Sequence, residues 1–203
     1  WSAAAPARGY FYSDGVRSLA VGATVGAAVA SRRTLATQAA GPAFDVVILA
    51  GGKGTRMKSE TPKQLLTIQG KPVLQWSLNT YCSMAEVRRI IVVLAEQYRA
   101  AEWLQKYHGR VEFADPGDER QDSVMSGLNC LEQHDESGDH LVCIHDAARP
   151  LVSASAVRRS VAQAAETGAA LLGVPVKPTI KQVAPRTDKV VGTLNREVLR
   201  EAQ

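Results

Sequence analysis

Residues 46–63 read VVILAGGKGTRMKSETPK, and this stretch decides how the rest of the chain is interpreted. Its first five residues are apolar and largely β-branched, which predicts a short buried strand of a parallel sheet. Gly51, Gly52 and Gly54 follow, and glycine lets backbone N–H groups approach a phosphate because no Cβ intervenes and positive φ is allowed. The same loop carries four cations, at Lys53, Arg56, Lys58 and Lys63. The stretch therefore predicts a nucleoside triphosphate site at the end of a strand.

Outward from this stretch, apolar runs alternate with amphipathic segments. Further strands are expected at Ile90–Ala95, Val111–Ala114, Leu141–His145 and Ala169–Val174. Four helices are expected between these strands. The first starts at about Pro72 with Leu74, Leu78 and Tyr81 facing inward, and the second contains Ala100, Trp103, Leu104 and Tyr107 and ends at Gly109. The third has its N-cap at Asp122 with Val124, Leu128 and Leu131 facing inward, and the fourth is capped by Ser153 or Ser155, has Val157, Val161 and Ala165 facing inward and ends at Gly168. Because such alternation requires right-handed crossovers, the sequence predicts an α/β fold: a Rossmann-like, mostly parallel sheet with helices on both faces.

Three polar, charged loops each follow a predicted strand, at residues 51–63, 116–123 and 146–149. In a parallel sheet the carboxyl ends of the strands lie at one edge, and ligands bind beyond that edge. We therefore expect these three loops to form one site.

Residues 177–195 have a different pattern, because apolar and polar residues alternate around a polar turn at 185–189. This predicts an antiparallel β-hairpin that is too polar for the core. An isolated hairpin is only marginally stable in water, so we expect it to protrude and to pack on a second copy as a dimerisation arm.

Residues 1–43 are rich in Ala, Ser and Arg and contain a single acid, Asp14, which is typical of an organelle transit peptide without packed structure. The apolar run Leu19–Ala30 leaves a secretory signal as the alternative. It is too short to span a bilayer, so we expect no stable membrane association. Because this segment carries +3 of the formal net charge of +4, the rest of the chain is nearly neutral, which argues against a nucleic-acid-binding surface.

The three cysteines, Cys82, Cys130 and Cys143, are odd in number, widely spaced and in no Cys-x-x-Cys pair. This pattern excludes a disulfide framework and a zinc site, and it favours a reducing compartment. We interpret all three as small buried apolar residues.

The glycine loop departs from two common phosphate-binding patterns. Thr55 rather than Lys follows Gly54, which excludes a P-loop, and two adjacent glycines exclude Gly-x-Gly-x-x-Gly. The remaining pattern, Ala-Gly-Gly-x-Gly-x-Arg-Met with Pro-Lys downstream, resembles the nucleotidyltransferases that couple a sugar or polyol phosphate to a nucleotide. The resemblance narrows to the 2-C-methyl-D-erythritol 4-phosphate cytidylyltransferase family on further segments, at Asp118–Val124, His145–Pro150, Thr179–Lys181 and Thr193–Arg196.

This resemblance implies a role for each matching residue. Arg56 and Lys63 match the catalytic basic pair that stabilises the crowded phosphorus in the transition state. Asp146 matches the carboxylate that holds Mg²⁺ near the triphosphate. The CTP pocket corresponds to Ala50, Gly51, Gly52, Gly54, Gly117, Asp118 and Ser123. The residues that bind the acceptor phosphate correspond to Arg149, Thr179 and Arg196, and Arg196 would be contributed by the other subunit.

The resemblance also implies that domain 44–203 belongs to a Mg²⁺-dependent homodimeric enzyme of non-mevalonate isoprenoid biosynthesis. Such an enzyme transfers CMP from CTP to 2-C-methyl-D-erythritol 4-phosphate and releases pyrophosphate. We expect it in the plastid stroma, with mitochondrial import as an alternative. Two other functions stay open, because ribitol 5-phosphate cytidylyltransferases share the same loops and a truncated product could bind nucleotide without turnover.

Two departures from the family pattern qualify this expectation. Asn195 stands where an Asp usually precedes the Arg. The family also continues beyond the position of Gln203, with further helices and with a strand and loop that complete the substrate site. For a polypeptide that stops at Gln203 we therefore expect negligible activity and poor solubility, since core faces of its strands would be uncovered.

Overall fold

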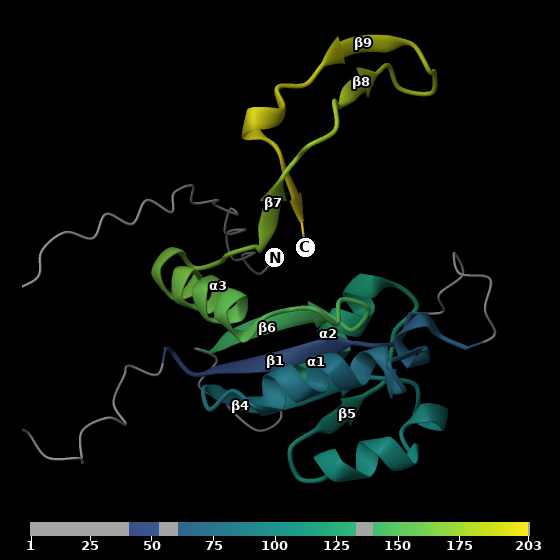
Figure 1. The fold of residues 1–203 in the computed structure, drawn as a ribbon, viewed down its shortest axis with the longest axis vertical. Helices are drawn as coiled ribbons and strands as arrows, with labels where there is room; N and C mark the ends of the chain where they lie inside the picture. Colours follow the sequence, from purple (N-terminus) through teal and green to yellow (C-terminus); the bar gives the residue numbers. More distant parts are fainter. Residues whose placement is uncertain (1–40, 53–60, 133–139, 203) are drawn as a thin grey trace, which may run out of the picture.

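The computed structural model describes residues 41–52, 61–132 and 140–202, so the predicted leader lies outside the described residues except for its last three positions. The centre of the fold is a parallel four-stranded sheet in the order β5-β4-β1-β6 (Figure 1). Its strands are β1 (Phe44–Leu49), β4 (Val87–Val93), β5 (Glu112–Ala114) and β6 (Leu141–Asp146). Because β1 lies between two neighbours, its residues Val46, Val47 and Ile48 are each 0% exposed. The predicted parallel sheet is confirmed.

Helices cover both faces of this sheet, as predicted. α1 (Val73–Cys82) and α3 (Ala154–Thr167) pack into one apolar cluster, whereas α2 (Arg120–Glu132) packs on a second one. Alternate residues of β1 serve the two clusters, since Val46 and Ile48 face α1 and α3 and Val47 faces α2. The shorter elements are η2 (Lys63–Leu65), β2 (Thr67–Ile68), β3 (Lys71–Pro72), η3 (Glu96–Tyr98), η4 (Glu102–Tyr107), β7 (Gly173–Pro175), β8 (Lys181–Val183), β9 (Val190–Thr193), η5 (Arg196–Val198) and β10 (Arg200–Ala202).

α1 matches its prediction, because it begins directly after Pro72 and fully buries Leu74, Leu78 and Tyr81. The helix predicted up to Gly109 is instead the 3₁₀ helix η4. Its two buried residues, Leu104 and Tyr107, are three positions apart, and a 3₁₀ helix places such residues on one side. Gly109 ends the segment with a φ of 77°, as a terminating glycine does.

α2 differs from its prediction at its start and on its inner face. It begins at Arg120, so Asp122 is its third residue rather than its N-cap. Its buried residues are Ser123, Gly127 and Leu131, whereas Val124 is only half-buried. Gly127 explains the rotation, because a Cβ there would lie 2.4 Å from the Cγ1 of Val47, so only a glycine lets the helix approach the sheet this closely.

α3 is capped as predicted. Its N-cap Ser153 accepts a hydrogen bond from the Ala156 N–H at 3.3 Å, and Gly168 ends it in the left-handed region with a φ of 87°. Val157 and Val161 are buried, but the inward placement of Ala165 was wrong. Residues 165–168 are all exposed, because the last turn of α3 extends beyond the core cluster.

The strand predicted at Ala169–Val174 was wrong in extent and in pairing. Only Gly173–Pro175 is extended as β7, and it pairs antiparallel with β10 in a separate two-stranded ladder. A short apolar run does not reveal its partner, and Leu171 within this run is 59% exposed.

The predicted hairpin at residues 177–195 is confirmed. β8 and β9 pair antiparallel, and the protruding hairpin extends away from the central sheet (Figure 1). Its apolar side chains Val183, Val190 and Val191 are 49%, 55% and 56% exposed, so they have no core of their own.

The three cysteines are free thiols, half-buried rather than fully buried as predicted. Burial raises the pKa of the Cys143 thiol, which therefore stays protonated near neutral pH. In the part of the chain that the structure describes, none of the helices has the length and apolar character needed to cross a membrane.

Candidate functional site

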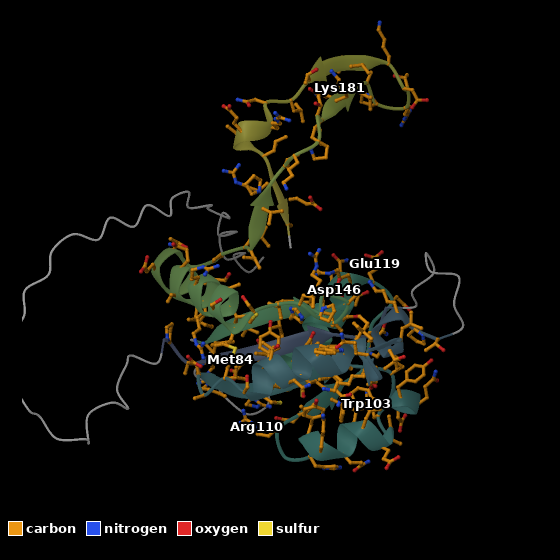
Figure 2. All side chains as sticks on the ribbon, viewed as in Figure 1. Met84, Trp103, Arg110, Glu119, Asp146 and Lys181 are labelled. Carbon is orange, nitrogen blue, oxygen red and sulfur yellow. The ribbon has the colours of Figure 1, made fainter. Side chains whose placement is uncertain are left out.

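The three loops predicted to form one site do meet at the carboxyl edge of the sheet. A Cβ added at Gly51, after β1, would lie 2.3 Å from the Cβ of Pro116, after β5. The Ala147 N–H, after β6, donates to the Leu49 carbonyl at 3.1 Å. Figure 2 shows Asp146 and Glu119 on this side of the molecule. Strand topology therefore assembles the site, as the rule for parallel sheets requires.

The glycine loop is hydrogen-bonded by Gln64, a residue that the sequence did not single out. Gln64 is 3% exposed, and its Nε2 donates to the carbonyls of Ala50 and Gly52, the latter at 3.3 Å. The Ala50 N–H donates to the Val93 carbonyl at 2.9 Å. Among the described residues, the N–H groups of Gly51 and Gly52 have no hydrogen-bond partner. Two backbone donors therefore remain available to a ligand.

Of the predicted catalytic pair, only Lys63 can be placed. It is the first residue of η2 and is half-buried, directly before Gln64. Arg56 and Gly54, the latter predicted to contact CTP, lie outside the described residues. A lysine at this position supplies a point charge on a flexible stem beside the glycine loop.

The loop between β5 and α2 is shaped by its own contacts. The Gly117 N–H donates to the Ser123 hydroxyl at 3.1 Å, and a Cβ at Gly117 would lie 2.2 Å from that of Asp122. The Asp122 carboxylate accepts from the Glu119 N–H at 2.9 Å, so it closes the first turn of α2 as in a capping box. Asp118 is exposed at the rim. The predicted CTP-pocket residues of this loop are thus adjacent, and Asp122 has a structural role.

Asp146 lies at the end of β6 in a tight turn. One of its carboxylate oxygens accepts from the Ala148 N–H at 2.9 Å, and its carbonyl accepts from the Arg149 N–H at 3.0 Å. The described residues contain no group of three His, Cys, Asp or Glu side chains that could hold a metal ion. A single half-buried carboxylate fits Mg²⁺ that takes its other ligands from substrate phosphates and water.

His145, next to Asp146, faces the opposite side of the sheet. It is 7% exposed, its Nε2 is 3.1 Å from the Ser77 hydroxyl, and its ring packs edge-on against Tyr81. Burial lowers the pKa of His145 to about 4, and the nearby Asp146 only partly offsets this effect. The ring is therefore neutral at physiological pH, and the Ser77–His145 pair is buried too deeply to meet a substrate.

The predicted acceptor-binding residues are not brought together within one chain. Arg149 lies beside Asp146 and donates to the Ala202 carbonyl of β10 at 3.4 Å. Thr179 and Arg196 lie on the arm, which leads away from the sheet edge, and Arg196 donates to the Lys177 carbonyl at 2.9 Å. The side chain of Asn195 accepts from the Glu197 N–H at 3.0 Å. Asparagine therefore keeps the N-cap function that an aspartate would have there, but not its charge.

The sequence comparisons give the family of this chain. The family model of 2-C-methyl-D-erythritol 4-phosphate cytidylyltransferase matches residues 44–203. The chain is 44% identical over 165 residues to the chloroplastic enzyme of that name from Oryza sativa subsp. japonica, covering 78% of this chain and 52% of the relative. It is 42% identical over 154 residues to the enzyme of that name from Chlamydia trachomatis serovar D, covering 76% and 64%. The chain thus spans about half to two thirds of the length of these relatives.

The solved structures agree as well. The 2-C-methyl-D-erythritol 4-phosphate cytidylyltransferase of Thermus thermophilus is similar with a TM-score of 0.59 and 27% identity, over 79% of this chain and 68% of that one. A 4-diphosphocytidyl-2C-methyl-D-erythritol synthase from Anaerococcus prevotii has a TM-score of 0.64 at 23% identity, over 80% and 67%, which supports the fold. Since the family model covers every strand of the fold, the chain belongs to the 2-C-methyl-D-erythritol 4-phosphate cytidylyltransferase family.

Proposed function

We propose that this chain binds CTP at the carboxyl edge of its sheet and takes part in transfer of CMP to 2-C-methyl-D-erythritol 4-phosphate. The observation that carries the proposal is the placement of the Gly51 and Gly52 N–H groups, unpaired among the described residues, and Lys63 on one loop, with Asp146 at the end of the adjoining strand β6. Family membership supplies the choice of nucleotide and acceptor.

The reaction needs charge stabilisation more than proton transfer. An oxygen of the acceptor phosphate, already anionic at neutral pH, attacks the α-phosphorus of CTP in line. The bond from that phosphorus to the bridging β-oxygen breaks, and pyrophosphate leaves. The barrier comes from bringing anions together, so fixed cations lower it. Lys63 serves this purpose, and Arg56 does so under the same proposal. No general base is required, which accords with the neutral, buried His145.

Mg²⁺ is the proposed metal, with Asp146 as its protein ligand. When bound, the ion would neutralise charge on the triphosphate. The Ala148 N–H donates to one oxygen of Asp146 and so restrains the carboxylate that would hold the ion.

The proposed active form is a homodimer joined through residues 177–195. The exposed valines of β8 and β9 and the predicted reach of Arg196 into the other subunit support this assembly. The plastid is the proposed location, supported by the leader composition and by the chloroplastic rice relative.

Two measurements test the proposal. Calorimetry should show CTP bound more tightly than ATP or GTP in the presence of Mg²⁺, and Asp146→Asn should weaken the Mg²⁺-dependent part of that binding. Pyrophosphate release should be faster with 2-C-methyl-D-erythritol 4-phosphate than with ribitol 5-phosphate. Faster release with ribitol 5-phosphate would select the other acceptor. CTP binding without release from either acceptor would identify a non-catalytic product, and absence of CTP binding would refute the nucleotide site itself.

A further inference from the structure

Gln64 is a buried polar residue whose side-chain hydrogen bonds, within the described residues, both go to the glycine loop. It is the middle residue of η2 and follows Lys63 directly. Both partners of its carboxamide, the carbonyls of Ala50 and Gly52, are acceptors, so the NH₂ group must face them. Its two N–H donors are thereby used on the loop that carries the N–H groups of Gly51 and Gly52.

The orientation of these peptides follows from amide geometry. In a trans peptide the N–H points opposite to the C=O, so holding the Ala50 carbonyl against Gln64 directs the Gly51 N–H to the other side. The Ala50 N–H is held by Val93, and Gly51 lies against Pro116. The peptide between Ala50 and Gly51 is therefore restrained at both ends. Gln64, on the side opposite the ligand, fixes the direction of the Gly51 N–H.

The other half of the carboxamide points to the same conclusion. Among the described residues, the Gln64 Oε1 is buried and has no hydrogen-bond partner. A buried unsatisfied acceptor destabilises a fold by roughly 1–3 kcal/mol. Turning the carboxamide over would set this oxygen against two carbonyl oxygens, so the two hydrogen bonds donated to the glycine loop fix its orientation.

We propose that Gln64 is a positioning residue for nucleotide binding: by holding the Ala50 carbonyl it keeps the Gly51 N–H facing CTP, by holding the Gly52 carbonyl it restrains the next part of the loop, and it couples this loop to Lys63. The inference rests on the proposed function, because CTP is the ligand concerned. It adds a residue that touches neither nucleotide nor acceptor and acts through the loop.

The test compares Gln64→Met with the matched control Gln75→Met, in the whole chain. Gln75 is also a buried glutamine, 7% exposed, but it lies on α1. Gln64→Met should weaken CTP binding roughly tenfold, the effect of losing about 1.4 kcal/mol of preorganisation. The ¹⁵N order parameters of Gly51 and Gly52 should fall. The melting temperature should also fall, because the buried Ala50 carbonyl loses its donor, so CTP binding is compared at a temperature where both variants are folded. The control should bind CTP as wild type does.

Gln64→Glu provides a second variant with its own signature. An ionised carboxylate repels both carbonyls, whereas a protonated carboxyl donates one hydrogen bond to them. CTP affinity of Gln64→Glu relative to wild type should therefore recover as the pH falls, which a merely structural role would not produce.

The outcomes separate this inference from the proposed function. If wild type binds CTP and Gln64→Met binds it within twofold with unchanged order parameters, the clamp is wrong. If wild type does not bind CTP, the proposed function fails, and the loop order parameters of the two methionine variants still decide whether Gln64 orders the loop. An unfolded Gln64→Met together with a pH-independent Gln64→Glu would assign Gln64 to stability and overturn the inference.

Discussion

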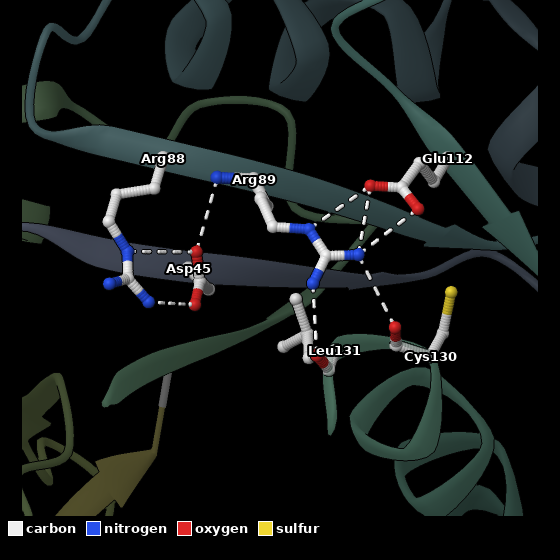
Figure 3. Close-up of polar contacts among 6 residues, drawn as sticks. All are labelled: Asp45, Arg88, Arg89, Glu112, Cys130 and Leu131. Atoms are coloured by element: carbon white, nitrogen blue, oxygen red, sulfur yellow. Dashed lines mark hydrogen bonds and ion pairs between the residues drawn. The ribbon is translucent and has the colours of Figure 1, made fainter. Parts of the chain in front are cut away.

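At the amino ends of β1, β4 and β5, charged side chains are paired with one another, whereas the loop after the carboxyl end of β1 leaves two backbone donors unpaired among the described residues. Asp45, 2% exposed, is bound by the Arg88 guanidinium at 2.6 Å and by the Arg89 N–H at 3.2 Å (Figure 3). Arg89 in turn binds Glu112 at 2.9 Å and the carbonyls of Leu131 and Cys130 at the end of α2. These contacts satisfy carbonyls that the last helical turn leaves without partners.

The carboxyl edge has the opposite character. Within the described part of the chain, its loops keep two N–H groups without partners, at Gly51 and Gly52, and place the half-buried Lys63 and Asp146 beside them. Gly52 is exposed and Gly51 is half-buried, so a ligand can approach this loop from solvent. The carboxyl edge also has an ion pair, between Arg99 and Asp115, so within the described residues the contrast lies in the unpaired N–H groups of the loop after β1.

The largest expected effect is that of Lys63→Ala on catalysis. Removing one preorganised cation from a phosphoryl-transfer site should lower kcat by about 10²–10³-fold, or about 3–4 kcal/mol. Binding of CTP should remain measurable, and the melting temperature should not change. Steady-state kinetics and calorimetry check both, with Lys71→Ala as control, since Lys71 lies over the Trp76 ring and outside the site. Near-normal turnover of Lys63→Ala would remove the catalytic role of this lysine.

Asp45→Ala should have the complementary effect, on stability alone. It would leave the Arg89 N–H without its acceptor and remove the Asp45 carboxylate from Arg88, at a cost of about 3 kcal/mol in the free energy of unfolding. Urea denaturation measures this loss, and CTP affinity of the folded variant should be unchanged. A selective loss of CTP binding without destabilisation would contradict the division between the two edges.

The pH dependence of stability should come in part from His145. Its pKa in the folded state, about 4, lies below the ordinary value of 6.5, so the unfolded chain binds more protons between these values. Its contribution is therefore fully present above about pH 6.5 and is lost as the pH falls toward 4. From about pH 7 to about pH 5 the loss should be about 2 kcal/mol. Chemical denaturation at both values checks this, and His145→Gln should reduce the dependence by that amount. An unchanged dependence would show that His145 is accessible to protons.

The smallest effect is expected for Glu112→Gln. Its side chain is 45% exposed, so the ion pair with Arg89 should contribute only about 0.5 kcal/mol and less at high salt. Denaturation at low and high ionic strength measures it. A loss as large as that of Asp45→Ala would mean that the amino-edge residues act as one cooperative network.

Local patterns were sufficient for the features that depend on local sequence. The apolar runs predicted β1, β4, β5 and β6, and glycine at a helix end predicted the stop at Gly168. The three loops could be assigned to one edge because parallel topology puts them there. Gly51 and Gly117 were assigned to ligand contact, but the structure gives each an internal reason as well, in Pro116 and Asp122.

Features that depend on distant partners could not be predicted. Gln64 is 14 residues from Ala50, and Ser77 is 68 residues from His145, so neither contact leaves a periodic signal. The rotation of α2 depends on Gly127 meeting Val47, and the pairing of β7 depends on β10, which follows the arm. In each case a contact between residues far apart in the sequence determines the structure, and the local sequence is compatible with more than one arrangement.

The ladder at the base of the arm has a practical consequence. Because Pro175 pairs with Arg200 and Val174 with Glu201, the chain leaves and re-enters the body at adjacent points. The β7–β10 ladder holds the two ends of segment 176–199 close together. Replacing this segment with a shorter one should therefore add little entropic cost of loop closure. A two-residue turn could replace this segment and preserve the β7–β10 pairing, which would give a compact variant in which the proposed dimerisation can be tested without the arm.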